Sequence, residues 1–387
     1  MSVSKSNYKA KEEPHEDGNL VDDGSTGVET EETHSEETII RPFDPTLIRV
    51  ETKPMTVDLI VSRIKEAEID LTPGFQRKAG IWTEGAQSRL IESMLIRIPL
   101  PAFYMDATNE DKWLIVDGLQ RITTIKSFVI DKKFKLTELE FLPHLHDKTF
   151  DKLPRNFQRR ILETQITAYL IEKGTPAAVK YTIFKRINTG GLPLSAQEIR
   201  HALNQGKATQ LLAELADSNE FKLSTDYGIR DQRMADRECV LRFLAFAIVP
   251  YSEYKVPDLD AFLNDRMAKI NQLMNRDLKN LKDRFLHSMK AAREIFGNLA
   301  FRKYYGKQFS RHPINKALFE AWSVNLDKLT DDQLQRLISR KDTLMKKFIL
   351  LMQNTDFEKA VSQGTGDVSK VRLRFSRIEA LIQEVLS

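Results

Sequence analysis

The chain has 387 residues, of which 41% are hydrophobic, so it is long enough for two or three domains that each bury a core. Its single cysteine, Cys239, excludes an intramolecular disulfide and a cysteine-based metal cage, and a lone thiol is typical of a reducing compartment such as the cytoplasm. No run of apolar residues approaches the length of a membrane span, so no membrane partner is expected.

The net charge of +4 is unevenly distributed along the chain. Residues 1–38 contain three lysines and eleven acidic residues, a net charge of −8, and the remaining chain therefore carries +12. A segment this acidic and this poor in aromatic residues buries too little apolar surface to offset its ordering entropy, so we predict a disordered acidic tail. Its expected role is to increase solubility, because no apolar anchor is evident in it; the alternative is an autoinhibitory mimic of a nucleic acid.

Apolar residues at periodic spacing predict an α+β domain over residues 39–205. The expected elements, in chain order, are a helix from Val57 to Ile64 capped by Thr56, a strand at 69–71, a helix at 90–98 that Pro99 and Pro101 end, a hairpin of 102–105 with 113–116, a helix from Gly118, a strand at 166–171, a helix at 177–187 and a helix that a capping box opens at 195–198.

Beyond residue 205 the pattern is that of helices alone, which predicts a mostly α-helical domain over residues 206–387. The segments with helical spacing lie near 208–217, 236–248, 258–272, 276–297, 314–325, 331–352 and 369–386. Cys239 lies among apolar neighbours in this domain and is expected to be inert.

The stretch Val116-Asp117-Gly118-Leu119-Gln120-Arg121 is the strongest candidate for a binding site, because a strand, a tight turn and a helix meet there. A helix N-terminus offers free N–H donors and the positive end of the helix dipole, and a glycine lets a phosphate approach the backbone. The guanidinium of Arg121 could bind the same anion, with hydroxyls from Thr123 or Thr124.

Each candidate loop also has an interpretation that needs no ligand. Asp117 followed by Gln120 matches a helix capping box. Arg77, in the polar loop Gly74-Phe75-Gln76-Arg77, could be a plain surface charge. The segment Lys185 to Gly191 could be an ordinary helix C-cap with glycine, or a weak nest for an anion. From the residues alone, both interpretations stay open for all three loops.

Several catalytic motifs are absent from the sequence. There is no Walker A lysine motif, no Gly-x-Ser-x-Gly elbow, and no His-Glu-x-x-His or histidine–asparagine cluster of nuclease character. His144, His146 and His312 are expected to be structural or surface residues, and no metal site is predicted from protein ligands.

Taken together, the three loops resemble one family, the N-terminal domain of GmrSD-type restriction enzymes, also known as domain-of-unknown-function family 262, with its DGQQR motif. The resemblance covers residues 40 to about 330. It rests on Phe75-Gln76-Arg77 with Trp82, Leu90 to Pro101, Val116 to Thr124, Phe184 to Gly191, Arg233 to Glu238, and Leu241 to Phe243.

The resemblance implies a ParB/sulfiredoxin-like fold for the first domain and a module that binds and hydrolyses a nucleoside triphosphate, with Mg²⁺ as its counter-ion, in bacterial defence against foreign or modified DNA. Carried over residue by residue, the implied catalytic residues are Asp117, Gln120 and Arg121. The implied nucleotide-binding residues are Gln76, Arg77, Gly118, Thr123, Thr124, Arg186, Asn188, Thr189 and Gly190.

Two departures from the family pattern bear on the activity. Leu119 stands where the family usually has glutamine, and an apolar side chain cannot bind a phosphate, so hydrolysis follows less directly than binding. No cysteine stands where sulfiredoxin has its nucleophile, so that reaction is excluded. No HNH nuclease centre is recognisable either, which leaves room for a separate nuclease or defence protein as a partner.

Two alternatives to nucleotide hydrolysis stay open. One is a DNA-binding or DNA-nicking protein without nucleotide turnover, which the net charge of +12 outside the tail favours, and the other is an interaction scaffold with a vestigial pocket.

Overall fold

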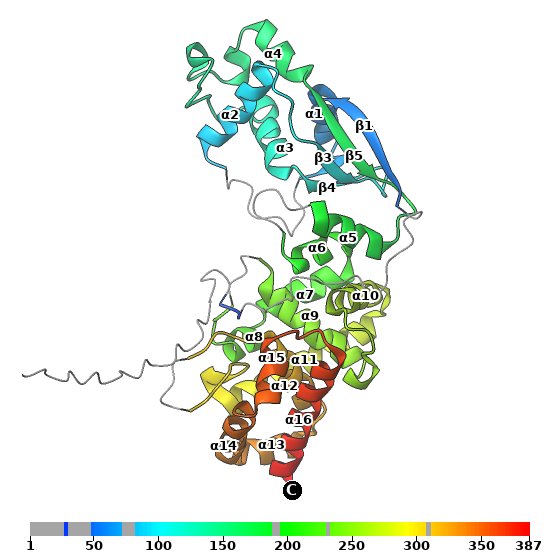
Figure 1. Cartoon of the computed structure of the whole chain (residues 1–387), viewed down its shortest axis with the longest axis vertical. Coiled ribbons are helices and arrows are strands. Elements are labelled where there is room, and N and C mark those ends of the chain that lie inside the picture. The colour runs from blue at the N-terminus through cyan, green and yellow to red at the C-terminus, as the bar shows by residue number, and fades with distance from the viewer. Residues whose placement is uncertain (1–26, 30–47, 72–81, 188–193, 230–232, 307–310) are drawn as a thin grey trace, which may run out of the picture.

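The protein is described here from a computed structural model that defines residues 27–29, 48–71, 82–187, 194–229, 233–306 and 311–387. It has the expected α+β architecture, in which a sheet lies near the N-terminus and helices follow (Figure 1). We call the described residues from 48 to 204 the sheet part and those from 205 to 387 the helical part. Within these ranges no helix is long and apolar enough to cross a membrane.

Five strands form one mixed sheet in the order β1-β5-β3-β4-β2. The pairs β1–β5 and β3–β4 are antiparallel, and the pairs β5–β3 and β4–β2 are parallel. The strands are β1 (Val50–Thr56), β2 (Ile69–Asp70), β3 (Phe103–Asp106), β4 (Trp113–Asp117) and β5 (Gln165–Ile171). The predicted β3–β4 hairpin and the strand at 166–171 are therefore confirmed.

The sequence pattern does not predict β1. This strand lies at the edge of the sheet, where it pairs with β5 alone, and the side chains of residues 50–54 are exposed. No alternation of apolar and polar residues can mark a strand that buries so little. Pro54 is compatible with this place because an edge strand does not need every backbone N–H for a ladder.

Helices cover both faces of the sheet. The first face is covered by α1 (Val57–Lys65), α2 (Glu84–Leu95), α3 (Leu119–Ile125) and α4 (Arg155–Leu162), and the second by α5 (Ala177–Ile187) and α6 (Ala196–Leu203). Along β4, Trp113 and Ile115 join the core of the first face, while Val116 packs with Phe184 of α5 and Ile199 of α6 on the second. In Figure 1, α5 and α6 lie between the sheet and the helical part.

The ends of these helices show which local signals were informative. The hydroxyl of Thr56 accepts a hydrogen bond from the N–H of Leu59, and Ser195 forms the predicted capping box with Glu198. The second helix begins and ends earlier than the predicted 90–98: it spans Glu84–Leu95, and Arg97 beyond its end adopts a positive φ of 64°. Ile98 is 49% exposed, so its predicted place on the packed face is wrong.

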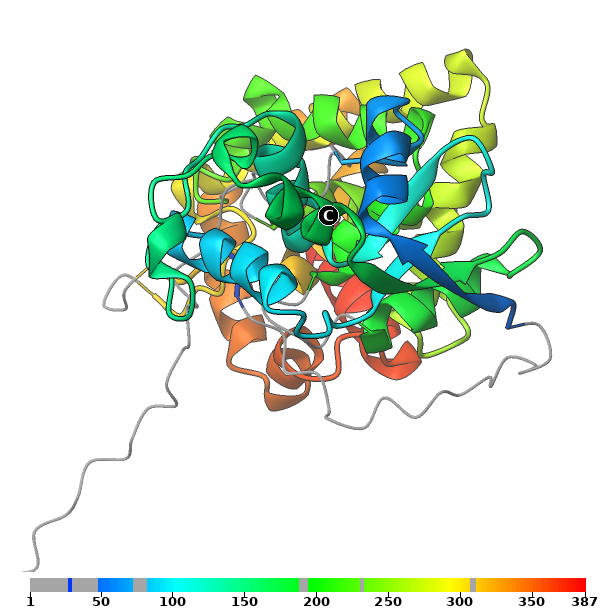
Figure 2. The ribbon, with the colours of Figure 1, turned by 90° about the horizontal axis from the view of Figure 1, so that it is seen from above.

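The helical part contains ten α-helices among its described residues, packed around one large apolar core (Figures 1 and 2). They are α7 (Lys207–Asp217), α8 (Asn219–Ser224), α9 (Ala235–Ile248), α10 (Leu259–Gln272), α11 (Asn275–Phe296), α12 (Lys316–Asp327), α13 (Asp331–Ser339), α14 (Lys341–Met352), α15 (Thr355–Ser362) and α16 (Val368–Leu386). The segment predicted at 331–352 divides at Arg340 into two helices. Two short helices, α8 and α15, are too brief for a periodic signal.

Cys239 lies in α9 and is fully buried in the core of the helical part. Burial raises the pKa of its thiol to about 12, so the reactive thiolate is scarce at neutral pH. We expect no modification when the native protein is treated with a thiol reagent, and one equivalent of modification in denaturant. Labelling of the native protein within minutes would contradict this placement.

A short piece of the predicted tail does not behave as a free tail. Residues 27–29 lie against the helical part, beside α8 in Figure 1, and Val28 is only 2% exposed. The prediction that nothing in the acidic tail anchors it is therefore wrong for these three residues. The charge and low hydropathy of the segment could not predict this contact, because it depends on Ile314, far along the chain.

Candidate functional site

The candidate site is built at the junction between β4 and α3. Gly118 is the N-cap of α3 and has a φ of +97°, a left-handed conformation that favours glycine. A Cβ at this position would lie 2.5 Å from Cδ1 of Phe103, so a side chain has no room there. The tight turn and the close approach of β3 therefore require a glycine here. Phe103 fills the space beside it, so a ligand cannot bind on that side.

The capping-box interpretation of Asp117 and Gln120 is wrong. Asp117 is the last residue of β4, and no side chain caps α3. The first backbone N–H groups of a helix have no acceptor within the helix, so those of residues 119–121 remain available to a ligand or to water.

The carboxylate of Asp117 is used instead to hold Arg121. The Nη2 of Arg121 donates to Oδ2 of Asp117 over 2.8 Å and to the carbonyl oxygen of Ala102 over 3.2 Å. Its Nη1 donates to the carbonyl oxygen of Pro101, and the guanidinium lies 4.3 Å from the centre of the Phe103 ring. Arg121 therefore ties α3 to the segment that enters β3.

This environment makes Asp117 and Arg121 a partly buried ion pair. The Arg121 side chain is 11% exposed, and burial lowers the pKa of the guanidinium while Asp117 partly restores it. Oδ1 of Asp117 has no hydrogen bond within the described part of the chain. The junction thus combines free N–H donors, a guanidinium fixed by its pairing with Asp117, and one open carboxylate oxygen.

The other predicted residues of α3 differ in their surroundings. Leu119 packs in the core of the first sheet face, so its side chain points away from the open end of the helix. The hydroxyl of Thr124 is buried and donates to the carbonyl oxygen of Gln120 over 2.8 Å, which commits it to the helix. The hydroxyl of Thr123 is buried without a hydrogen-bond partner among the residues described. The side chain of Gln120 is half-buried.

The remaining predicted site residues are not brought to this junction by any described contact. Arg186 is exposed near the end of α5, on the opposite face of the sheet from α3, and no hydrogen bond or ion pair between described residues joins it to Asp117 or Arg121. Gln76, Arg77, Asn188, Thr189 and Gly190 lie outside the described residues.

A second set of buried charges joins the sheet part to the helical part, and two of its members, Glu238 and Arg242, lie in segments that carry the family resemblance. Nη1 of Arg200, in α6, donates to Oδ1 of Asp260 over 2.7 Å, and its Nη2 lies 3.8 Å from Oε2 of Glu238. Nη2 of Arg242 donates to Oε1 of Glu238 over 2.9 Å, and the Nζ of Lys316 lies 3.1 Å from the same oxygen.

The network has a clear electrostatic consequence. The carboxyl of Glu238 is buried, which alone would raise its pKa, but the charges of Lys316, Arg242 and Arg200 overcome this and hold the pKa well below its usual range. Glu238 is therefore ionised in the folded protein. In the sequence, this network is indicated only by charged residues at otherwise apolar positions of α6 and α9. Such a pattern suggests buried charges but does not show which residues pair with each other.

His201, next to Arg200 in α6, gives this region a pH dependence. Burial, and then the charge of Arg237, lower the pKa of the imidazole from 6.5 to about 4. The unfolded chain thus binds a proton that the folded chain refuses, so stability is lost as pH falls below 6.5. We expect the free energy of unfolding in urea to fall by about 2 kcal/mol between pH 6.5 and 4.5, since each pKa unit corresponds to about 1.4 kcal/mol. The same decrease in a His201→Asn variant would contradict this assignment.

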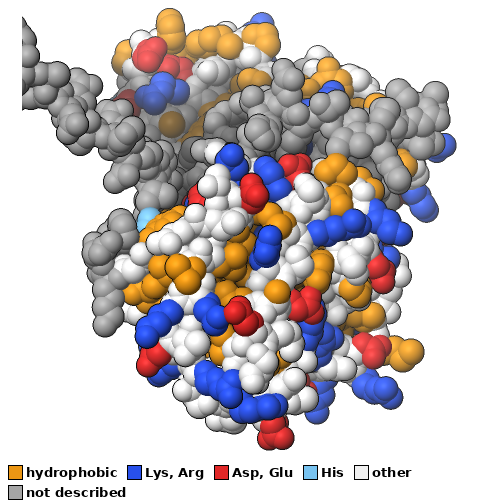
Figure 3. Space-filling model, turned by 60° about the horizontal axis from the view of Figure 1, so that its bottom comes forward, with side chains coloured by type: hydrophobic (Ala, Val, Ile, Leu, Met, Phe, Trp, Pro, Cys, Tyr) orange, Lys and Arg blue, Asp and Glu red, His pale blue; other side chains and the backbone are white. Residues whose placement is uncertain are grey.

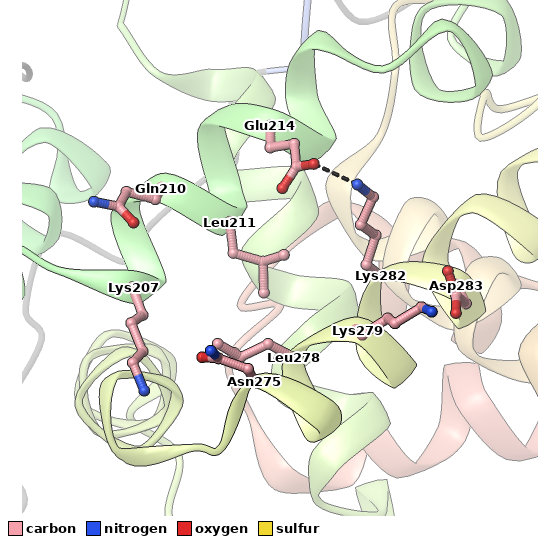
Figure 4. Close-up of a pocket in the computed structure, with 9 residues that line it drawn as sticks. All are labelled: Lys207, Gln210, Leu211, Glu214, Asn275, Leu278, Lys279, Lys282 and Asp283. Atoms are coloured by element: carbon pink, nitrogen blue, oxygen red, sulfur yellow. Dashed lines mark hydrogen bonds and ion pairs between the residues drawn. The ribbon is translucent and has the colours of Figure 1, made fainter.

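A groove of about 420 Å³ lies in the helical part between α7 and α11 (Figure 4). Three lysines line it, but Lys207 donates to the carbonyl oxygen of Leu273 and Lys282 pairs with Glu214. Lys279 has no such partner among the described residues, and Asp283 also faces the groove. With its charges largely paired, this groove is a weaker candidate for an anion than the β4–α3 junction.

The sheet part defines an α+β domain whose most distinctive feature is the Asp-Gly-Leu-Gln-Arg turn between β4 and α3. Residues 58–204 match the family model of the GmrSD restriction endonuclease N-terminal domain, so this segment is similar to that family. The resemblance seen in the sequence is confirmed over this range, while its extension to about residue 330 stays a prediction. No curated protein matches the chain.

Proposed function

We propose that the sheet part binds and hydrolyses a nucleoside triphosphate within a restriction-like defence system directed against foreign or modified DNA. The family that residues 58–204 match, which is named for a restriction endonuclease, supports the restriction-like setting. The observation that carries the nucleotide assignment is the β4–α3 junction, where uncapped N–H groups adjoin the fixed pair of Asp117 and Arg121. Such a junction favours a bound phosphate electrostatically.

Each residue at the junction has a distinct role in the proposal. The N–H groups of residues 119–121 hold phosphate oxygens, and the guanidinium of Arg121 supplies positive charge from a position fixed by its neighbours. Gln120, in the first turn of α3, orients the attacking water. The open oxygen of Asp117 accepts a hydrogen bond from that water or from the solvent shell of a metal ion. Leu119 takes no part, since it lies in the core.

Magnesium fits these residues as the counter-ion of the substrate. No group of three His, Cys, Asp or Glu side chains suited to a metal lies within the described ranges, so they contain no dedicated metal cage. Mg²⁺ is commonly held by one or two carboxylates together with the phosphates of the nucleotide, and Asp117 offers one such carboxylate. When bound, the ion would neutralise charge on the phosphates.

The net charge of +12 outside the acidic tail favours DNA binding without turnover as the second candidate. On the face shown in Figure 3, however, lysines and arginines are interspersed with acidic and apolar side chains. This face has no continuous basic track of the kind that follows a phosphate backbone. DNA and a separate nuclease therefore enter the proposal as partners of the system.

The experiment is to incubate the full-length protein with each of the four common ribonucleoside triphosphates and Mg²⁺ and to measure phosphate release. We expect turnover that falls at least tenfold in Gln120→Ala without a change in melting temperature. Gln210→Ala, an exposed glutamine of α7, is the matched control and should retain full activity. Tight DNA binding with no release from any nucleotide would favour the second candidate instead.

A further inference from the structure

We propose that the helical part contains a peptide-docking site, which binds the chain's own segment Gly27-Val28-Glu29 through main-chain hydrogen bonds and side-chain contacts. The site consists of the backbone of Ile314 and the side chains of Lys303 and Asn315. It is separate from the β4–α3 junction and does not depend on the proposed nucleotide chemistry.

The backbone of Ile314 is the centre of the docking site. It bridges Val28 in parallel on one side and Arg302 in antiparallel on the other. The N–H of Glu29 donates to the carbonyl oxygen of Ile314 over 2.8 Å, and the N–H of Ile314 donates to the carbonyl oxygen of Gly27 over 3.2 Å. Main-chain hydrogen bonds provide affinity when a peptide pairs with the backbone of its binding site.

The side chains of the segment provide specificity. Val28 is buried, and the carboxylate of Glu29 is held at both oxygens: Oε1 lies 2.6 Å from Nζ of Lys303, and Oε2 accepts from Nδ2 of Asn315 over 3.0 Å. The Lys303 side chain is 5% exposed, and its other acidic partner, Glu358, lies farther away at 3.6 Å. Glu29 is therefore the closest countercharge of a buried ammonium, and an unpaired charge there would be costly.

The glycine is also selected by the site. Gly27 has a φ of +73°, and a Cβ built on it would lie 1.8 Å from the carbonyl oxygen of Gly228. Because the obstacle is backbone, it cannot move aside as a flexible side chain would. The site therefore recognises a Gly-Val-Glu sequence: a glycine for close approach, a small apolar residue for the buried position and a carboxylate for Lys303.

The structure places the segment in the docking site of its own chain. Residues 30–47 connect Glu29 to the sheet part, where the carbonyl oxygen of Arg49 accepts from the N–H of Glu172 over 3.0 Å. The N-terminal segment is thus fixed to the helical part at one point and to the sheet part at another. Docking in cis joins the two parts by a second connection, in addition to the direct chain through α6 and α7.

The test uses a labelled peptide of residues 22–34 and the full-length chain. In the wild type the site is filled by the chain itself, so we expect no peptide binding; in Val28→Asp, a charge in the buried position releases the segment and the peptide should bind. A peptide with Gly27→Ala, which differs by one methyl group, should bind at least tenfold more weakly, as should a peptide with Glu29→Lys. Equal binding of the wild-type and Gly27→Ala peptides, or no binding to Val28→Asp, would overturn the proposal.

One further measurement keeps the proposal testable if Val28→Asp does not fold, and a second separates docking in cis from exchange between two copies. Hydrogen exchange on the wild type should show a protected amide at Glu29, and Lys303→Ala should increase its exchange rate at least tenfold; rapid exchange in the wild type would count against docking. Light scattering should show that the mass of the wild type equals that of Val28→Asp. A wild-type dimer that Val28→Asp dissociates would overturn docking in cis in favour of exchange between two copies.

Discussion

Replacing Glu320 with alanine is expected to lower the free energy of unfolding by about 3–5 kcal/mol, the range found when one partner of a buried ion pair is removed. Glu320 lies in α12 and is fully buried between two buried arginines. Its Oε1 accepts from Nε of Arg374 in α16 over 2.9 Å, and Oε2 accepts from Nη1 of Arg242 in α9 over 3.4 Å. Without it, two guanidinium groups lose their shared countercharge in the core.

Urea denaturation at neutral pH measures this effect. Glu294→Ala is the matched control, because Glu294 is exposed on α11 and its loss should change stability by no more than about 0.5 kcal/mol. A loss below about 1 kcal/mol for Glu320→Ala would show that water or rearrangement compensates the two arginines. The burial described for these charges would then be incorrect.

The second large effect is expected for Arg121→Ala, which should abolish nucleotide turnover and also lower the free energy of unfolding by about 2–4 kcal/mol. From the sequence, Arg121 is expected only to bind a ligand, so its loss would leave the fold intact. The structure corrects that view, since the guanidinium binds the carbonyl oxygens of Pro101 and Ala102, pairs with Asp117 and lies over Phe103. Its removal takes a donor from these partly buried or exposed acceptors, along with its packing on Phe103.

Arg89→Ala is the control for this prediction, because Arg89 pairs with Glu138 at the surface and such pairs contribute about 1 kcal/mol or less. Arg121→Lys separates the effect of charge from that of geometry, because lysine keeps the positive charge but loses the planar guanidinium. We expect a free energy of unfolding between those of the wild type and Arg121→Ala, and little nucleotide turnover. An Arg121→Ala protein as stable and as active as the wild type would remove Arg121 from both the fold and the site.

Local signals in the sequence predicted the elements that depend on near neighbours. The capping residues Thr56 and Ser195 were correct, as was the helix at 177–187, because a cap and an amphipathic period are both contained in a few consecutive residues. The edge strand β1 was missed because its pairing with β5, more than a hundred residues away, leaves no alternating pattern in its own sequence.

The candidate site shows the same division. The turn at Gly118 was predictable, since a glycine between a strand and a helix is a local feature. The roles of the side chains were not, because they depend on what lies across the junction: Arg121 meets Phe103, and Leu119 enters the core. Likewise the docking of Val28 depends on Ile314, and charge and hydropathy within the acidic segment could not reveal it.

Hydrogen exchange at the first turn of α3 tests the central claim most directly. A non-hydrolysable nucleoside triphosphate with Mg²⁺ is added to the full-length protein, and exchange of the backbone amides of residues 119–121 is followed, with the α7–α11 groove as internal control. Our account predicts strong protection at residues 119–121 and none at Lys207 or Lys279. Unchanged exchange at residues 119–121 with every nucleotide at millimolar concentration would contradict the assignment of a nucleotide site to this junction.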